Sequence, residues 1–224
     1  MFPLARAHRH LATRLFYPSL AASALAVVLL FAREAMGAGG FRFLLWNLFL
    51  AWVPYIAALY AEHWTVGRTR IGAGTLIAGA VWLLFLPNAP YIMTDFVHLP
   101  RMGFVWWYDV GTLLAFAWSG CLLGVASLHV MQELVRARLG SAVAWGFVLS
   151  CVGLSGLGIY MGRFLRWNSW DVLTSPRSLA TELVALLSDP AAYPRLVGVS
   201  GLFACFLLLG YLTLYAARSG DRGR

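Results

Sequence analysis

The chain has 224 residues, of which 61% are hydrophobic and 12% are charged, with a mean hydropathy of +0.74. A soluble domain carries about 25% charged residues, so this composition excludes an ordinary soluble protein and favours one that folds in a bilayer. The net charge of +8 comes from arginine alone, and the arginines flank apolar runs. That placement is typical of membrane orientation, so we expect membrane lipids and no nucleic acid as partners.

Six apolar runs are long enough to cross a membrane, which predicts an all-α, polytopic transmembrane bundle. The first run has no convincing cleavage site after it and is taken as an uncleaved span. A single transmembrane domain, 16–217, is expected between a basic arm, 1–15, and a basic tail, 218–224. The expected spans are 16–32, 41–61, 71–86, 110–131, 141–161 and 196–217.

The third run ends in a break, Pro87-Asn88-Ala89-Pro90. Two prolines interrupt a helix here, and Pro100 disfavours helix at the residue before it, so a short broken or re-entrant helix is expected up to Leu99. α-Helical spacing would place Thr94, Asp95 and His98 on one face of this helix. Such a polar stripe in an apolar segment should face protein or water rather than lipid.

Glycines mark the fourth and fifth runs. The fourth contains Gly120-x-x-x-Gly124, a pattern typical of close helix packing. The fifth is glycine-rich towards its end, so we expect it to be the most tightly packed helix. The three cysteines lie inside apolar runs without metal-binding spacing and are interpreted as packing residues.

A second polar stretch, Gly162 to Asp171, follows the fifth run, and an amphipathic helix is expected after it. Its start is indicated by Ser175-Pro176, a cap followed by proline at the first helical position. Its leucines should share one face, opposite Thr181, Glu182 and Ser188, so that the helix lies in the membrane interface or packs on the end of the bundle. The leucines are Leu179, Leu183, Leu186 and Leu187.

Six spans place both termini on one side of the membrane. Ten arginines flank the spans on the side of the termini and seven on the other, so the positive-inside rule predicts cytoplasmic termini in a multi-pass protein of the cell inner (plasma) membrane. The segments 88–109 and 162–195 then emerge together on the non-cytoplasmic face. The candidate site is expected there.

Three interpretations compete for this polar collection. Asp95 could form an ion pair with Arg163 or Arg166 and tie the segments together. Alternatively, Arg163 and Arg166 hold an anionic phospholipid or polyprenyl-phosphate headgroup, while Asp95 and His98 supply acid–base chemistry. A metal site is the third interpretation; it would use Asp95, His98 and Asp171, but its third ligand is a guess, so no metal or cofactor is assigned. The further substrate-binding candidates are Asn88, Thr94, Asn168 and Asp171.

The favoured function is a polar site that binds or processes an anionic lipid-like substrate, and enzymatic activity is left open. A transporter or channel component is one alternative, and it needs a polar path across the whole membrane. A non-catalytic assembly or scaffold protein is the other, and no protein partner is indicated. A weaker cluster at the opposite end, Glu62, His63, His129 and Glu133, is interpreted as interfacial anchoring through local salt bridges.

Two motifs resemble a bacterial membrane-protein family known as domain of unknown function 1361. They run from Leu86-Pro87-Asn88-Ala89-Pro90 to His98-Leu99 and from Gly162-Arg163 to Trp170-Asp171. The resemblance covers about Ala24 to the C-terminus. It implies an integral membrane protein with several spans, and it assigns no activity, substrate, cofactor or residue role.

Overall fold

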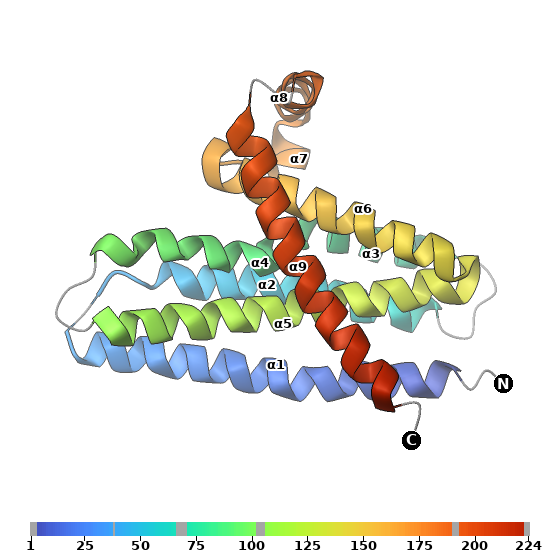
Figure 1. Cartoon of the computed structure of the whole chain (residues 1–224), viewed down its shortest axis with the longest axis horizontal. Helices are drawn as coiled ribbons and strands as arrows, with labels where there is room; N and C mark the ends of the chain where they lie inside the picture. Colours follow the sequence, from blue (N-terminus) through green and yellow to red (C-terminus); the bar gives the residue numbers. More distant parts are fainter. Residues whose placement is uncertain (1–3, 38, 66–70, 102–105, 190–192, 222–224) are drawn as a thin grey trace. The chain divides into compact units, whose positions relative to one another are not determined.

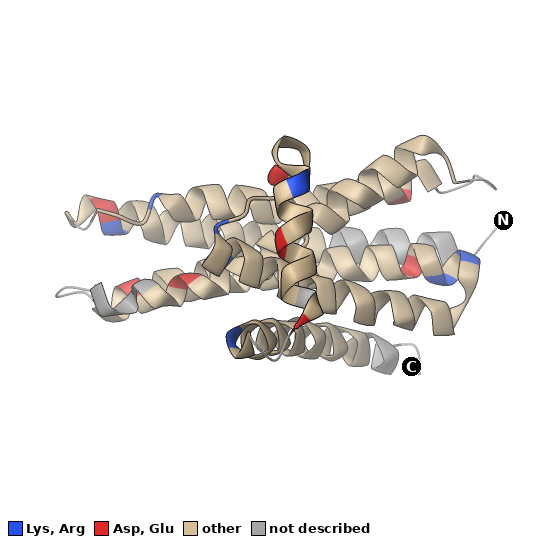
Figure 2. Ribbon diagram, turned by 90° about the horizontal axis from the view of Figure 1, so that it is seen from above, with Lys and Arg blue, Asp and Glu red and all other residues tan. Residues whose placement is uncertain are grey.

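The computed structural model describes residues 4–37, 39–65, 71–101, 106–189 and 193–221, and within these ranges it is helical and contains no strand. The side chains at 4–14, 98–101, 187 and 218–221 lie outside the description. Charged positions are sparse against the uncharged background of the ribbon (Figure 2). The predicted all-α fold is confirmed.

Six helical segments have the length and apolar composition needed to cross a membrane, as predicted. They are Leu15–Ala35, Phe43–Thr65, Ala73–Val97, Trp106–Leu139, Ser141–Leu165 and Pro194–Ala217. The third segment extends beyond the expected 71–86, because α3 (Ala73–Phe85) has only 13 residues. A helix of that length spans about 20 Å, too little for a hydrocarbon core of about 30 Å. The proline break therefore lies inside the third span rather than at its end.

The chain forms two compact units, Met1–Phe147 and Val148–Arg224, which are described here one at a time. In the first unit, α5 (Trp106–Leu139) packs against α1 (Leu4–Ala35) and α2 (Phe43–Thr65), and the three run side by side in Figure 1. Their core contains the fully buried side chains of Leu44, Tyr55, Leu113, Phe116 and Leu123.

The break packs on the same scaffold. It consists of α4 (Asn88–Tyr91) and the 3₁₀ helix η1 (Ile92–Arg101), and both contact α2 and α5. Gly120 of α5 permits this approach, because a Cβ there would lie 2.2 Å from the carbonyl oxygen of Ala89 and 3.2 Å from Ile92 Cδ1. The predicted role of this glycine in close packing is thus confirmed.

The second unit contains most of α6 (Ser141–Tyr160), η2 (Met161–Leu165, a turn of π-helix), α7 (Asp171–Thr174), α8 (Pro176–Ser188) and α9 (Pro194–Asp221). Buried Tyr160, Leu186 and Leu196 form a small core that joins the end of α6, α8 and the start of α9. Gly156 brings α6 against α9, since a Cβ there would lie 2.2 Å from the carbonyl oxygen of Ser200.

The expectation that the fifth run is the most tightly packed helix is wrong. In its apolar window 39% of the residues are buried, against 72% for α5. Gly156 makes a close contact, but a Cβ at Gly146 or Gly153 would meet open space. A high glycine content therefore does not by itself indicate a helix that is packed along its whole length.

Candidate functional site

The helix break satisfies its own backbone with side chains. A proline removes a hydrogen-bond donor and leaves a carbonyl without its usual partner, which is costly at membrane depth. The amide of Asn88 donates to the carbonyl of Phe85 at 3.1 Å, and the hydroxyl of Thr94 donates to the carbonyl of Tyr91 at 2.7 Å. Two of the predicted substrate-binding residues therefore help to stabilise the interrupted helix.

Asp95 is enclosed by protein. Its side chain belongs to η1, only 1% of the residue is exposed, and its Oδ2 accepts a hydrogen bond of 2.8 Å from the amide of Asn47 on α2. This hydrogen bond also gives the amide of Asn47, which lies in an apolar span, a partner outside its own helix. The carboxylate of Asp95 therefore faces protein rather than lipid, as predicted for a polar group in this apolar segment.

The 3₁₀ geometry of η1 changes the expected face. At three residues per turn, position 98 follows position 95 by one turn, whereas position 94 is about a third of a turn away. Thr94 therefore does not share the face of Asp95 as α-helical spacing predicted. The side chain of His98 lies outside the described residues.

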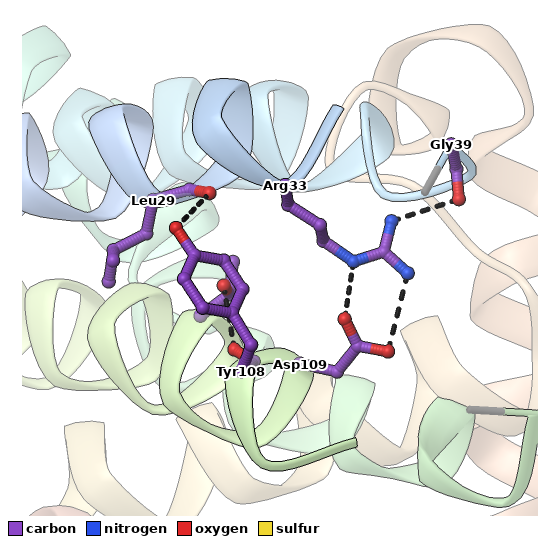
Figure 3. Close-up of polar contacts among 6 residues, drawn as sticks. Leu29, Arg33, Gly39, Tyr108 and Asp109 are labelled. Atoms are coloured by element: carbon purple, nitrogen blue, oxygen red, sulfur yellow. Dashed lines mark hydrogen bonds and ion pairs between the residues drawn. The ribbon is translucent and has the colours of Figure 1, made fainter. Parts of the chain in front are cut away.

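A buried ion pair joins α1 to the start of α5 (Figure 3). Arg33 Nε lies 2.5 Å from Asp109 Oδ1, and its Nη2 lies 3.3 Å from Oδ2. The guanidinium also donates to the carbonyl of Gly39 at 2.9 Å and lies 4.0 Å from the centroid of the Phe41 ring. Arg33 is 6% exposed and Asp109 is 1% exposed, so both charges depend on each other for compensation.

The pairing of Arg33 with Asp109 could not be predicted from the sequence. The partners are 76 positions apart, and nothing in their local sequence links them. Beside them, the hydroxyl of Tyr108 donates to the carbonyl of Leu29 at 3.0 Å and adds a second tie between α5 and α1 (Figure 3).

The second polar stretch begins with an irregular helix end. After the π-helical turn η2, Arg166 adopts a left-handed conformation with φ of 61°, and the N–H of Trp167 donates to the carbonyl of Met161 at 3.2 Å. This hydrogen bond joins residues six positions apart, one more than the 6→1 bond of a Schellman motif, because it closes a π-helical turn. In the Schellman motif glycine is the usual left-handed residue. In the described part of the chain, Arg166 is the one residue other than glycine with a positive φ.

Arg166 is exposed, and among the described residues its guanidinium has neither a hydrogen bond nor an ion pair. Arg163, on η2, is half-buried. A left-handed arginine costs about 1–2 kcal/mol relative to a relaxed backbone. Backbone strain of this kind is typical of functional positions, which makes Arg166 a candidate binding residue.

The acidic residues of this stretch bond to uncharged donors. Asp171 Oδ2 accepts from the backbone N–H of Asn168 at 2.7 Å and from its amide at 3.2 Å, and Oδ1 accepts from the hydroxyl of Thr174 at 3.1 Å. The backbone N–H of Asn168, followed by the hydroxyl and amide donors, holds the pKa of Asp171 below its ordinary value. Asp171 and Asn168 therefore close a local turn.

Glu182 is bound in the same manner. The indole N–H of Trp167 donates to its Oε2 at 2.5 Å, which ties α8 back to the end of η2. Glu182 was expected opposite the leucines of α8, and in the structure it is half-buried and bonded to Trp167. At 100° per residue Glu182 lies about 85° from the centre of the leucine face, at the edge of the polar side, from which its side chain reaches Trp167. The predicted helix start at Ser175-Pro176 is confirmed.

The structure thus brings Asn88, Thr94 and Asp95 together in the first unit and places Arg163, Arg166, Asn168 and Asp171 in the second. Each set of residues belongs to a different unit. The convergence of both sets on one site stays a prediction. Within the described residues, no group of three or more His, Cys, Asp or Glu side chains could hold a metal ion.

The second cluster, Glu62, His63, His129 and Glu133, was interpreted as interfacial anchoring, but part of it is more buried than interfacial residues would be. His129, Gln132 and Glu133 are 3%, 1% and 5% exposed, and Glu133 forms an ion pair with Arg136 at 2.5 Å. The predicted local salt bridge is confirmed for this pair. His63 is exposed, as expected of an interfacial residue.

Six apolar helices, an interrupted third span and paired charges at membrane depth define a multi-pass integral membrane protein. The chain belongs to the family described as "Protein of unknown function (DUF1361)", whose model matches residues 46–209. The match starts later than the expected Ala24 and leaves Arg33 outside it. Comparisons with curated proteins and with solved structures found no match.

Proposed function

We propose that this membrane protein binds an anionic lipid-like substrate through Arg163 and Arg166, with Asp95 and His98 supplying acid–base chemistry where the substrate is processed. The observation that carries the proposal is the side chain of Arg166, exposed at a strained helix end. An arginine fork suits a phosphate or carboxylate group, because it can donate two parallel hydrogen bonds.

The local acids leave room for such a ligand. Asp171 and Glu182 accept hydrogen bonds from Asn168, Thr174 and Trp167, which are uncharged donors. These bonds hold the turn closed without using Arg166 as a counter-ion. An external anion would supply the charge compensation that the described residues do not give to Arg166.

The expected topology supports the same assignment. If both termini are cytoplasmic, the third span, which contains the break, ends on the non-cytoplasmic face. The second polar stretch emerges on that face too, at the level of the lipid headgroups. Asp95 then lies near that face, where it is enclosed by protein and held by the amide of Asn47. Asn88 and Thr94 would act chiefly by holding the interrupted helix that carries Asp95.

The described part of α5 gives little support to a transport path. Its buried hydroxyls donate to carbonyls of their own helix: Thr112 to Tyr108, Ser119 to Ala115 and Ser127 to Gly124. These donors are already used within the helix, and large apolar side chains such as Phe116 and Leu123 lie between them.

Lipid binding measured by native mass spectrometry tests the proposal. Wild type, Arg166→Ala and Arg177→Ala would be released from mixed micelles that contain phosphatidylglycerol or a polyprenyl phosphate together with phosphatidylcholine. Both variants lose one positive charge from the same exposed segment. We expect retained anionic lipid to fall in Arg166→Ala and to stay at the wild-type level in Arg177→Ala.

Equal loss in both variants would indicate a general charge effect and would contradict a built site at Arg166. Retention of phosphatidylcholine as strong as that of the anionic lipids would contradict the assignment of an anionic substrate. For the acid–base step, Asp95→Asn should keep lipid binding, because Arg163 and Arg166 are unchanged.

A further inference from the structure

A short apolar turn in the second unit is exposed although it lies outside the six spans. Trp170 and Val172 are each 39% exposed, and Leu173 is 81% exposed, the largest value for any large apolar side chain among the described residues. The preceding span ends at Leu165 and the next begins at Pro194. A leucine left in water forgoes about 1.5–3 kcal/mol of burial, so this turn calls for a cover.

The turn is held at the end of the spanning helices. Leu186 of α8 packs with Tyr160 at the end of α6 and with Leu196 at the start of α9, and Glu182 is bonded to Trp167. These contacts fold α8 back on the end of α6 and the start of α9. The turn therefore stays beside the bilayer surface.

The leucine face of α8 was expected either to lie in the membrane interface or to pack on protein, and the structure shows packing on protein. Leu186 is 3% exposed, and Leu179 and Leu183 are half-buried, so this face is at least partly covered by protein. The residues left for lipid are instead those of the Trp170–Leu173 turn. Tryptophan is enriched at membrane interfaces, and exposed Arg166 and Arg177 flank the turn with charges that suit lipid headgroups.

We infer that the turn Trp170–Leu173 is inserted into the boundary between headgroups and acyl chains of the leaflet at which α6 ends. The occupant of this apolar surface is the bilayer that the protein already spans, because α8, which follows the turn directly, packs on the end of the apolar segment Ser141–Leu165. If the proposed function holds, this insertion lets a lipid-like substrate approach Arg166 sideways from the leaflet; the insertion itself does not depend on that function.

Site-specific fluorescence in vesicles tests the inference. A nitrobenzoxadiazole label would be attached to Leu173→Cys in the full chain with Cys121, Cys151 and Cys205 replaced by alanine. The control is Thr181→Cys, at an exposed position on the side of α8 away from its packed leucines. The protein is placed in vesicles of phosphatidylcholine and phosphatidylglycerol. Lipid that is spin-labelled near the top of the acyl chain serves as the quencher inside the membrane, and vesicles without it are the reference. Iodide serves as the quencher in water.

We expect the label at 173 to emit at shorter wavelength than the label at 181, to be quenched by the spin-labelled lipid, and to show a several-fold smaller quenching constant with iodide. Water-like emission with full iodide quenching at 173 would overturn the inference. A shielded label that spin-labelled lipid does not quench would also overturn it, since protein would then cover the turn.

If the cysteine-free chain is not recovered, buried Cys151 and half-buried Cys121 can be retained and Cys205 alone replaced. The chain with only Cys205 replaced is then labelled alone, and its fluorescence is subtracted from that of each labelled variant. Val172→Cys provides a second position in the same turn, and it must give the same ordering against Thr181→Cys as Leu173→Cys does.

Discussion

The two irregular segments of this protein are stabilised in opposite ways. In the first unit, the break and its surroundings are tied by buried contacts between distant parts of the chain, Asn47 to Asp95 and Arg33 to Asp109, at separations of 48 and 76 residues. In the second unit, the polar stretch is tied by contacts at separations of 3 and 15 residues, and most of them are exposed. The first arrangement fixes distant helices to one another, whereas the second fixes a turn and the short helix α8 that follows it.

This difference separates stability from binding. Buried long-range pairs in the first unit make its polar residues expensive to change, because each substitution strands a partner in a low-dielectric interior. Local pairs in the second unit keep the turn shaped while Arg166 remains exposed. Substitutions should therefore affect folding mainly in the first unit and ligand binding mainly in the second.

The largest expected effect is the loss of the buried ion pair. Replacing Arg33 with alanine leaves Asp109 charged and nearly fully buried, so we expect the free energy of unfolding to fall by about 3–5 kcal/mol. The measurement is reversible unfolding in detergent micelles. The double variant Arg33→Met/Asp109→Leu should recover most of the loss.

The exposed pair between Arg42 and Glu34 is the matched control. Arg42 is 80% exposed at its side chain, and its Nε lies 2.8 Å from Glu34 Oε1. Water screens such a pair, so Arg42→Ala should leave the unfolding curve close to that of wild type. A loss as large as that of Arg33→Ala would remove the distinction between buried and exposed pairs on which the comparison depends.

The next effect concerns the seat of the break on α5. In Gly120→Ala the new Cβ would lie 2.2 Å from the carbonyl oxygen of Ala89, so α4 must move, and we expect a loss of about 1–3 kcal/mol. Gly111→Ala on the same helix meets open space and should gain up to about 1 kcal/mol, because alanine favours helix. Thermal melting checks this prediction: the melting temperature should fall for Gly120→Ala and should not fall for Gly111→Ala. Equal shifts would show that the break does not depend on Gly120.

A comparable loss is expected at the partner of Asp95. Asn47→Ala removes a donor from a buried carboxylate and should cost about 1–3 kcal/mol. A double-mutant cycle of Asn47→Ala with Asp95→Ala isolates the interaction, since the second substitution removes the group left unsatisfied by the first. A coupling energy near zero would mean that the hydrogen bond does not tie η1 to α2.

The smallest effect is the pH dependence of the local turn. The folded pKa of Asp171 is lowered from 3.8, so the turn is stabilised at pH values above the unfolded pKa, and this contribution is lost as pH falls through the folded value. Asp171→Asn removes that dependence. The difference in melting temperature between wild type and the variant should therefore shrink as pH is lowered past 3.8, and a constant difference would contradict this role of Asp171.

Much of the architecture could be predicted because it depends on local patterns. The apolar runs, the proline break and the Ser175-Pro176 start follow from length, backbone chemistry and capping. Gly120 could be recognised from its spacing to Gly124 as a close-packing residue. In each case the cause lies within a few residues of the feature.

What could not be predicted depends on contacts between distant residues. Nothing in the sequence near Asp109 indicates Arg33, and Asn47 has several possible partners on other helices. The hydrogen bond between Trp167 and half-buried Glu182 could not be predicted without knowing where α8 lies. The left-handed backbone at Arg166 could not be predicted because glycine is the usual residue in that conformation. The candidate site was therefore located from its motifs, but the bonds that shape it were not.

The most direct measurement is the melting temperature of Arg166→Gly with and without phosphatidylglycerol, beside Arg177→Ala. Glycine relieves the positive φ at this position while removing the guanidinium. Without anionic lipid, Arg166→Gly should melt no lower than wild type; with it, wild type and Arg177→Ala should melt higher while Arg166→Gly stays unchanged. If the lipid raises all three equally, Arg166 does not bind the headgroup, and the assignment of the second unit as the binding region is contradicted.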